Sequence, residues 1–342
     1  MKYKLFSLIL GGMVATQAVA DDYACQVNTL IGTKGTGLTS GYLYPGATYP
    51  YGMVQFTPSY FSKRSGFVIN QLSGGGCEHM GNFPTFPVKG KLKMSPDNIL
   101  NYRINISEEK GHAGYYEAMV QEDIKAKLTV TERTGMASYE YPADQQYGTI
   151  IIGGGISATP IEQAAIVITA PNKCEGYAEG GNFCGLRTPY KVYFVAEFDT
   201  DALETGTWKR EELMPNTTFA EGEYSGVYFT FDVNKKKNIQ YKIGVSYVSV
   251  ENARENLKAE NTEWDFQKIQ NQAEAKWNHY LGMIEVEGTN PDRTTQFYTH
   301  LYRSFIHPNV CSDVNGEYMG ADFRVHKSRS KHYTSFSNWD TY

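Results

Sequence analysis

The sequence predicts a mainly β protein in which an antiparallel β-sandwich is followed by helices. Three observations lead to this fold class. The chain contains 26 Tyr and 17 Phe, and aromatic residues favour β-structure. Strand-like segments punctuated by turns fill residues 22–250 without amphipathic helices between them. Near residue 251 the spacing of the apolar residues changes to the three- and four-residue repeat of helices.

The strand-like segments follow one another at intervals that suit hairpins. Residues 127–133 alternate strictly in polarity, and residues 149–152 run into three glycines. Segments of this kind without intervening helices favour an antiparallel sandwich over a βαβ sheet. We expect the tyrosines mainly in the sandwich core; the alternative is exposed rings that stack on sugars. The further strand-like segments are residues 190–198, 226–231 and 239–250.

Helices are expected from residue 251 onward. Residues 251–258 are polar and helix-prone, Gly282 marks the end of a second helix, and Pro291 begins a third. The apolar faces of the second and third helices are predicted to consist of Trp264, Phe266, Ile269, Ala273, Trp277, Tyr280 and Leu281, and of Phe297, Tyr298, Leu301, Tyr302 and Phe305. No cap or polar tail follows Tyr342, so we expect the second, helical domain to be truncated.

The N-terminus has the features of a secretory signal peptide. Lys2 and Lys4 precede an apolar run over residues 5–14, and residues 18–20 form an Ala-Val-Ala cleavage site. The run is too short to span a membrane, and no other stretch is apolar enough. We therefore expect a secreted or periplasmic protein whose mature chain begins near Asp21. The predicted segments are a signal peptide (1–20), a β-sandwich domain (21–250), a helical linker (251–290) and the start of a helical domain (291–342).

Charge and cysteine content narrow the function classes. The formal net charge is −5, which gives no basic surface for nucleic acid. Five cysteines in an exported chain leave at least one unpaired. Cys174 and Cys184 are the disulfide candidate, because the residues between them suggest a flexible loop. No local spacing of cysteines or histidines indicates zinc, and the metal ligands stay unassigned.

Two glycine-containing motifs have only a superficial likeness to known binding loops. Residues 32–37 lack the Gly-Lys-Ser/Thr ending of a phosphate loop, and no strand-loop-helix pattern surrounds them. Residues 313–317 begin like a calcium loop but lack its later ligands. We interpret the second as a tight turn.

A third glycine cluster is the main candidate site in the sandwich. Glycine there permits positive φ angles and the close approach of a ligand or of a neighbouring domain; a purely structural turn is the alternative. The candidate residues are Ser73, Gly74, Gly75, Gly76, Cys77, Glu78 and His79.

Several motifs together resemble the family 92 glycoside hydrolases, which are bacterial exo-acting α-mannosidases. The likeness spans nearly the whole mature chain, in order, and residues 72–77 are similar to the family's Ser-Gly-x-Gly-Cys loop. The other matching stretches are residues 27–33, 44–56, 297–302, 309, 312–316 and 336–341.

The resemblance implies a β-sandwich of the galactose-mutarotase-like supersandwich type packed on an (α/α)6 barrel, with a mannose-containing glycan bound between them. It also implies Ca²⁺ dependence and inversion at the anomeric carbon. Inversion requires a general acid and a general base about 6.5–9.5 Å apart. In the family this pair and most calcium contacts lie beyond position 342, so no residue here is assigned as catalytic. We expect the chain alone to be inactive.

Two residues near the C-terminus match a sugar-binding motif of the family. Trp339 and Asp340 fall on its Trp-Asp-Thr sequence, whose Asp binds hydroxyls of the terminal mannose. The alternative for them is a barrel-core tryptophan and a helix cap. Residues 73–77 would reach toward the same sugar. Glu78 and His79 depart from the family's usual continuation, and we expect them on the leaving-group side.

Two further functions compete with a mannosidase. One is a non-catalytic carbohydrate-binding β-sandwich, and the other is an adhesion module without a sugar site. The aromatic helices after residue 290 argue against both, because neither would need them.

Overall fold

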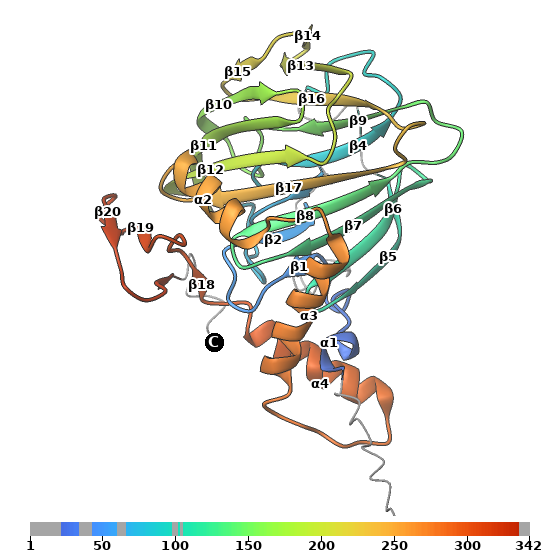
Figure 1. Ribbon diagram of the computed structural model, residues 1–342. Coiled ribbons are helices and arrows are strands. Elements are labelled where there is room, and N and C mark those ends of the chain that lie inside the picture. Colours follow the sequence, from blue (N-terminus) through green and yellow to red (C-terminus); the bar gives the residue numbers. More distant parts are fainter. Residues whose placement is uncertain (1–21, 34–42, 60–65, 98–101, 103–104, 335–342) are drawn as a thin grey trace, which may run out of the picture.

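The computed structural model describes residues 22–33, 43–59, 66–97, 102 and 105–334. Two large antiparallel sheets dominate this part of the chain, and all of the described helices except the short α1 follow them in sequence (Figure 1). The predicted mainly β fold is therefore confirmed. The first sheet has the order β1 (Ala47–Thr48), β2 (Gln55–Pro58), β3 (Phe67–Val68), β4 (Thr85–Lys89), β9 (Tyr147–Ile152), β16 (Ser225–Asp232), β13 (Glu204–Lys209) and β14 (Glu212–Pro215).

The second sheet contains nine strands among the described residues. Its strands include the segment predicted at residues 190–198 and most of those predicted at residues 127–133, where β7 ends at Val130, and at residues 239–250. The last of these ends at Ser246, earlier than predicted, because Ser249 already caps the following helix by accepting a hydrogen bond from the Asn252 N–H. The order is β15 (Phe219–Glu221), β10 (Ile161–Ala170), β11 (Lys173–Phe183), β12 (Leu186–Phe198), β17 (Asn238–Ser246), β8 (Thr134–Glu140), β7 (Ile124–Val130), β6 (Tyr115–Val120) and β5 (Ile106–His112).

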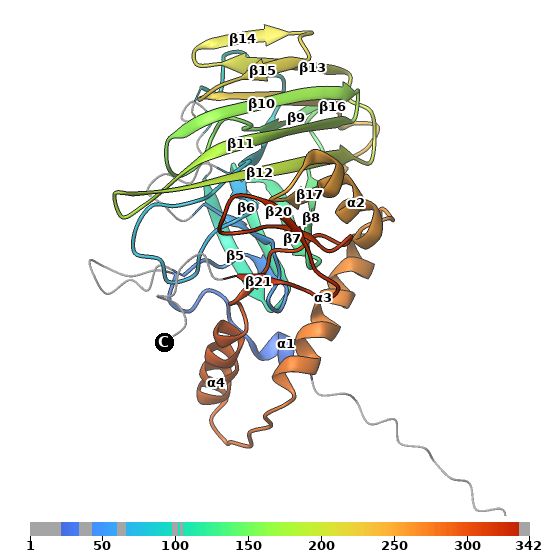
Figure 2. The same cartoon turned by 90° about the vertical axis from the view of Figure 1, so that its left-hand side faces the viewer.

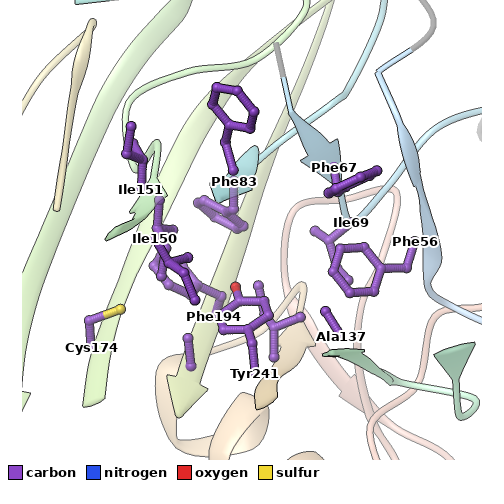
Figure 3. Packing of buried hydrophobic residues seen from close by; sticks show 14 of the residues in the cluster. Phe56, Phe67, Ile69, Phe83, Ala137, Ile150, Ile151, Cys174, Phe194 and Tyr241 are labelled. Atoms are coloured by element: carbon purple, nitrogen blue, oxygen red, sulfur yellow. The ribbon is translucent and has the colours of Figure 1, made fainter. Parts of the chain in front are cut away.

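The core lies between the two sheets and is unusually aromatic. The Phe198 ring lies 4.8 Å from that of Phe229 and 5.3 Å from that of Tyr241, and Tyr116 and Tyr139 are fully buried. Figure 3 shows part of this packing, in which Phe194 and Tyr241 lie close to isoleucines of β9. The expectation that tyrosines fill the sandwich core is confirmed for these residues.

The disulfide predicted between Cys174 and Cys184 is wrong. Cys184 is bonded to Cys77, 107 residues away in sequence, while Cys174 is a free thiol buried in the core (Figure 3). The residues between Cys174 and Cys184 form strand β11 and not a flexible loop. An extended strand rises about 3.3 Å per residue, so the two cysteines lie at opposite ends of it and cannot meet.

Four helices lie within the described residues: α1 (Tyr23–Gln26), α2 (Val250–Glu260), α3 (Phe266–Leu281) and α4 (Pro291–Ser304). The α2 helix covers the outer face of β12 and β17, where Ala253 and Leu257 pack on Val195. As predicted, Gly282 follows the last residue of α3, and Pro291 begins α4. Asn290 caps α4 by accepting hydrogen bonds from the next two N–H groups beyond the proline.

The helices α3 and α4 pack with α1 against one end of the sandwich (Figures 1 and 2). The Trp277 indole donates to the Thr48 carbonyl at 2.7 Å and lies 4.5 Å from the Tyr302 ring. Trp264, predicted on the same face as Trp277, instead precedes α3 and is 37% exposed. The cluster that joins helices and sandwich consists of Ala24, Val27, Tyr44, Ala113, Trp277, Leu281, Tyr298, Tyr302 and Ile306.

After α4 the chain returns along the side of the sandwich near α2 (Figure 1). It forms β18 (Asn309–Val310), β19 (Glu317–Met319), β20 (Val325–Lys327) and β21 (Tyr333–Thr334). The predicted turn at residues 313–317 is present, since the Gly316 N–H donates to the Asp313 carbonyl at 2.9 Å and Gly316 has a φ of 87°.

Candidate functional site

A cavity of about 610 Å³ lies where the sandwich meets the segment that follows α4. Three parts of the chain form its walls: the glycine-rich loop over residues 72–80, the turn end of the β11–β12 hairpin, and residues 311–334. The lining residues are Leu72, His79, Met80, Glu179, Asn182, Phe183, Thr188, Pro189, Tyr190, Lys191, Tyr247, Cys311, Met319, Gly320, Ala321, Phe323 and Thr334.

The glycine-rich loop is organised around the His79 ring. The imidazole Nε2 accepts a hydrogen bond from the Leu72 N–H at 2.8 Å, and Nδ1 donates to the Cys77 carbonyl at 2.6 Å. Gly74 has a φ of 76°, which favours glycine. A Cβ at Gly75 would lie 2.7 Å from Cε1 of His79, so these glycines let the loop close around the ring.

A second buried imidazole connects this loop to the residues after α4. His307 Nε2 accepts a hydrogen bond from the Ser73 N–H at 3.4 Å, and its Nδ1 donates to the Asn309 side chain at 2.8 Å. Burial lowers the pKa of His307 and of His79, and the charge of the nearby His307 lowers the pKa of His79 slightly further. Both imidazoles are therefore neutral at pH 7, as their acceptor role at Nε2 requires.

The turn of the β11–β12 hairpin forms a second wall, in contact with the first. The Cys77–Cys184 disulfide joins this turn to the glycine-rich loop, and the Phe183 ring packs edge-on at 5.7 Å from the His79 ring. Deeper in, the Tyr190 hydroxyl donates to Asn82 Oδ1 at 2.6 Å. Two segments far apart in sequence are thus covalently joined beside the cavity.

The third wall is fixed to the sandwich by a buried carboxylate. Asp313 is 2% exposed, and its side chain accepts hydrogen bonds from Ser246, Asn252 and Asn256 at 2.6–2.9 Å. Burial raises the pKa of Asp313 despite these donors. Because the donors come from β17 and α2, this network holds the turn at residues 313–317 against the sandwich.

A smaller cavity of about 400 Å³ adjoins the first and shares Cys311, Met319, Gly320, Ala321 and Thr334 with it. Stacked aromatic rings form part of its wall, where Tyr318 lies 3.9 Å from His332 and 5.6 Å from His326. Both cavities are therefore bounded by residues that follow α4.

The predicted site residues divide into three groups. His79 lines the larger cavity, and Ser73 to Cys77 form the loop behind it, with Ser73 and Gly75 buried. Glu78 and Gly76 are exposed and do not line it. Trp339 and Asp340 lie outside the described residues; Thr334, shortly before them in sequence, lines the cavity.

The hairpin wall was not foreseen from the sequence. Glu179, Lys191 and Tyr190 line the cavity, but in sequence they are ordinary members of two alternating strands. Only the projection of the hairpin turn toward residue 77 brings them to the site. A pairing of Cys77 with Cys184 would have been the one available signal.

No described residue is assigned to calcium. Within the part of the chain that the structure describes, no group of three or more His, Cys, Asp and Glu side chains could hold a metal ion. Glu179 is the one carboxylate among the described residues of the larger cavity. In the described residues, no helix is both long and apolar enough to cross a membrane.

Comparison with known proteins agrees with this arrangement. The family 92 glycosyl hydrolase N-terminal domain matches residues 26–246, and the family 92 catalytic domain matches residues 252–342. A protein of Arthroderma benhamiae described as an uncharacterized secreted glycosidase is 26% identical over 91% of this chain and 45% of its own length.

Solved structures give the same result. The family GH92 alpha-mannosidase BT3965 from Bacteroides thetaiotaomicron superimposes with a TM-score of 0.83 at 26% identity, covering 94% of this chain and 46% of that one. The inverting mannosidase BT2199 from the same organism shares the fold, with a TM-score of 0.78 at 24% identity over 93% of this chain and 44% of that one. The chain thus spans about half the length of these relatives. It belongs to glycosyl hydrolase family 92.

Proposed function

We propose that this chain is the N-terminal part of a secreted, calcium-dependent, inverting exo-α-mannosidase that acts on mannose-containing glycans. The sugar would bind in the larger cavity, between the β-sandwich and the helical domain. Support comes from the family membership and from a relative, BT3965, whose structure was solved in complex with mannoimidazole and which is 25% identical in that complex.

The observation that carries the proposal is the composition of the cavity. Its walls come from both regions that match family 92, the N-terminal domain and the start of the catalytic domain. Aromatic and apolar side chains such as Phe183 and Met319 alternate with polar ones such as Asn182 and Lys191. A pyranose has apolar C–H faces and several hydroxyls, so it suits a wall of this mixed kind.

Inverting hydrolysis requires two carboxyl groups on opposite sides of the glycosidic bond. Glu179 is a single carboxylate in the described wall, and it does not supply such a pair. We therefore assign the described residues to binding and positioning, and we propose that the catalytic acid and base come from the rest of the helical domain. Calcium belongs to the same proposal by family resemblance, and no step is assigned to it here.

Trp339 and Asp340 complete the proposed sugar site. A carboxylate accepts hydrogen bonds from adjacent hydroxyls, and an indole ring packs on the C–H face of a sugar. Thr334 already lines the cavity, which supports a role for the residues that follow it in sequence.

The test uses the natural full-length protein and an aryl α-mannoside. We expect hydrolysis that a calcium chelator abolishes and added calcium restores, with the β-anomer of mannose as the first product seen by NMR. Asp340→Ala should lower kcat/KM by at least about a hundredfold, the scale at which loss of key active-site contacts is felt. Asp201→Ala, at an exposed loop position, is the matched control.

Three results would count against the proposal. An unchanged kcat/KM in the Asp340→Ala variant removes that residue from the site. Binding of mannosides without hydrolysis favours the non-catalytic carbohydrate-binding function. A secreted protein whose N-terminus is still Met1, when sequenced, contradicts cleavage near Asp21.

A further inference from the structure

The β11–β12 hairpin extends beyond its neighbours in the sheet. Pairing between β10 and β11 ends at Gly180, and pairing between β12 and β17 begins at Tyr193. Among the described residues, Tyr190 to Val192 pair with Ala178 to Gly180, which also pair with β10, whereas Asn182 and Phe183 pair only with Arg187 and Leu186. Residues 181–189, called the ribbon below, therefore form a two-stranded projection (Figure 2), and such a hairpin is only marginally stable alone.

Few interactions hold the turn end of the ribbon in place. The Arg187 guanidinium forms two hydrogen bonds with the Glu162 carboxylate, but these side chains are 67% and 40% exposed. Exposed ion pairs of this kind contribute little. The Phe183 ring contacts His79 edge-on. The remaining connection at the turn is covalent, namely the Cys77–Cys184 disulfide.

This disulfide joins two walls of the same cavity. On one side, Asn182 and Phe183 of the ribbon line the cavity, and on the other side His79 does so. The loop that carries Cys77 is irregular and contains Gly74 at positive φ and the exposed Gly76. Without the bridge, no strong connection remains between the ribbon turn and this loop.

We propose that the Cys77–Cys184 disulfide is a positioning element that couples ligand binding in the cavity to the redox state of the protein. Its link to sugar binding rests on the proposed function. A dithiol reductant transfers two electrons to the bridge, the S–S bond breaks, and each cysteine gains a thiol proton while the dithiol closes to its own disulfide. The ribbon then moves away from His79, and the affinity for ligand falls while the sandwich stays folded.

The experiment measures two properties of the natural full-length protein, before and after treatment with a dithiol. Calorimetry gives the Kd for mannoimidazole, and limited trypsin digestion reports cleavage after Arg187 in the ribbon. We expect Kd to rise about tenfold on reduction, within the usual range of couplings between sites. Cleavage after Arg187 should become faster, while far-UV circular dichroism stays unchanged.

Two variants separate the bridge from other effects of the dithiol. The double variant Cys77→Ser/Cys184→Ser should show the weak binding and fast cleavage of the reduced protein whether or not dithiol is present. Cys25→Ser removes an exposed free thiol and should behave as the parent protein does in both states.

The outcomes distinguish this inference from the proposed function. Tight mannoimidazole binding that is the same before and after reduction overturns the positioning role and leaves the proposed function intact. Absence of mannoimidazole binding in the oxidised protein overturns the proposed function. If the oxidised protein binds no mannoimidazole, the cleavage data still test the inference. A rate of cleavage after Arg187 that is the same before and after reduction overturns the inference. A faster rate after reduction supports the bridge as the element that fixes the cavity wall.

Discussion

The Nε2 atom of His307 lies 3.4 Å from the backbone nitrogen of Ser73 and accepts its hydrogen bond. Ser73 belongs to the region that matches the family 92 N-terminal domain, and His307 belongs to the region that matches the catalytic domain. A buried neutral imidazole thus connects the two regions directly behind the cavity. The protonation state of this ring should matter for the loop at residues 72–80.

Acid should weaken this connection. Burial holds the pKa of His79 and His307 below the ordinary 6.5, so below pH 6.5 the unfolded chain takes up protons that the folded protein does not. The contribution of the two neutral imidazoles to the free energy of unfolding should therefore be fully present above pH 6.5. It should decrease as the pH falls toward the pKa values of the folded protein. Urea denaturation at pH 7.5 and pH 5 measures this loss.

Variants of the two imidazoles identify their share of the acid dependence. His79→Gln/His307→Gln should reduce the difference in unfolding free energy between pH 7.5 and pH 5. His300→Gln, at an exposed position on α4, should leave it unchanged. An equal pH dependence in the parent and in the double variant would show that other groups cause it.

A methyl group at residue 75 should disturb the loop at its centre. In Gly75→Ala the new Cβ would lie 2.7 Å from Cε1 and 3.2 Å from Nδ1 of His79, so the ring must move away from the Leu72 N–H. Overpacking of this kind costs about 1–3 kcal/mol, and ligand affinity should fall with it. Chemical denaturation and calorimetry measure both. Gly288→Ala, whose Cβ would meet its nearest neighbour only at 3.7 Å, should be neutral.

Lys242 should give the protein an alkaline pH dependence. Its ammonium group donates to the Asn261 carbonyl at 2.9 Å and lies 4.0 Å from the centre of the Trp264 ring, and burial lowers the pKa of Lys242 to about 8 from 10.5. Below pH 8 Lys242 is charged in both the folded and the unfolded protein, so the folded protein bears the full cost of burying this charge. Between pH 8 and 10.5 only the folded protein loses the proton, so the free energy of unfolding should rise relative to Lys242→Met. If the free energy of unfolding changes with pH in the same way in the parent protein and in Lys242→Met, the prediction is wrong.

Peptide mapping should identify one bridge in the described part of the oxidised protein, between Cys77 and Cys184. On the chain-entropy account, closing a loop of about 100 residues contributes about 4.7 kcal/mol, so Cys184→Ser should lower the free energy of unfolding by a few kcal/mol. Denaturation with and without a reductant gives the value. Detection of a Cys174–Cys184 peptide in the native protein would refute the assignment.

The sequence was sufficient for the sheets and helices because their patterns are local. Alternation at residues 127–133 indicated a strand, and β7 includes the first part of it up to Val130, although residues 128–133 are all buried. The spacing from Ile269 to Trp277 reflects one buried helix face, which the chain shows without reference to any other segment. Trp264 broke the pattern, since Asp265 caps α3 after it and Lys242 packs on its ring. That contact depends on the position of β17, which spacing alone does not reveal.

The site was harder to predict because it is built by long-range contacts. The loop at residues 73–79 could be identified from its glycines and its family likeness. Its partners Phe183 and Tyr190 follow about a hundred residues later, and the strand register decides that they reach it. The interpretation of residues 175–183 as a loop had the same cause, because three glycines in this stretch suggested flexibility where β11 continues.

The separation of the bridged cysteines bears on how the protein is produced. In an unfolded chain the probability of contact falls as about the 3/2 power of the separation, so Cys184 meets Cys174 about 35 times more often than it meets Cys77. Oxidation before folding would favour the incorrect bridge. Once β11 has joined the sheet, Cys174 is buried and can no longer react. Expression in an oxidising compartment with a disulfide isomerase, or oxidation delayed until after refolding, should therefore give the higher yield of native protein.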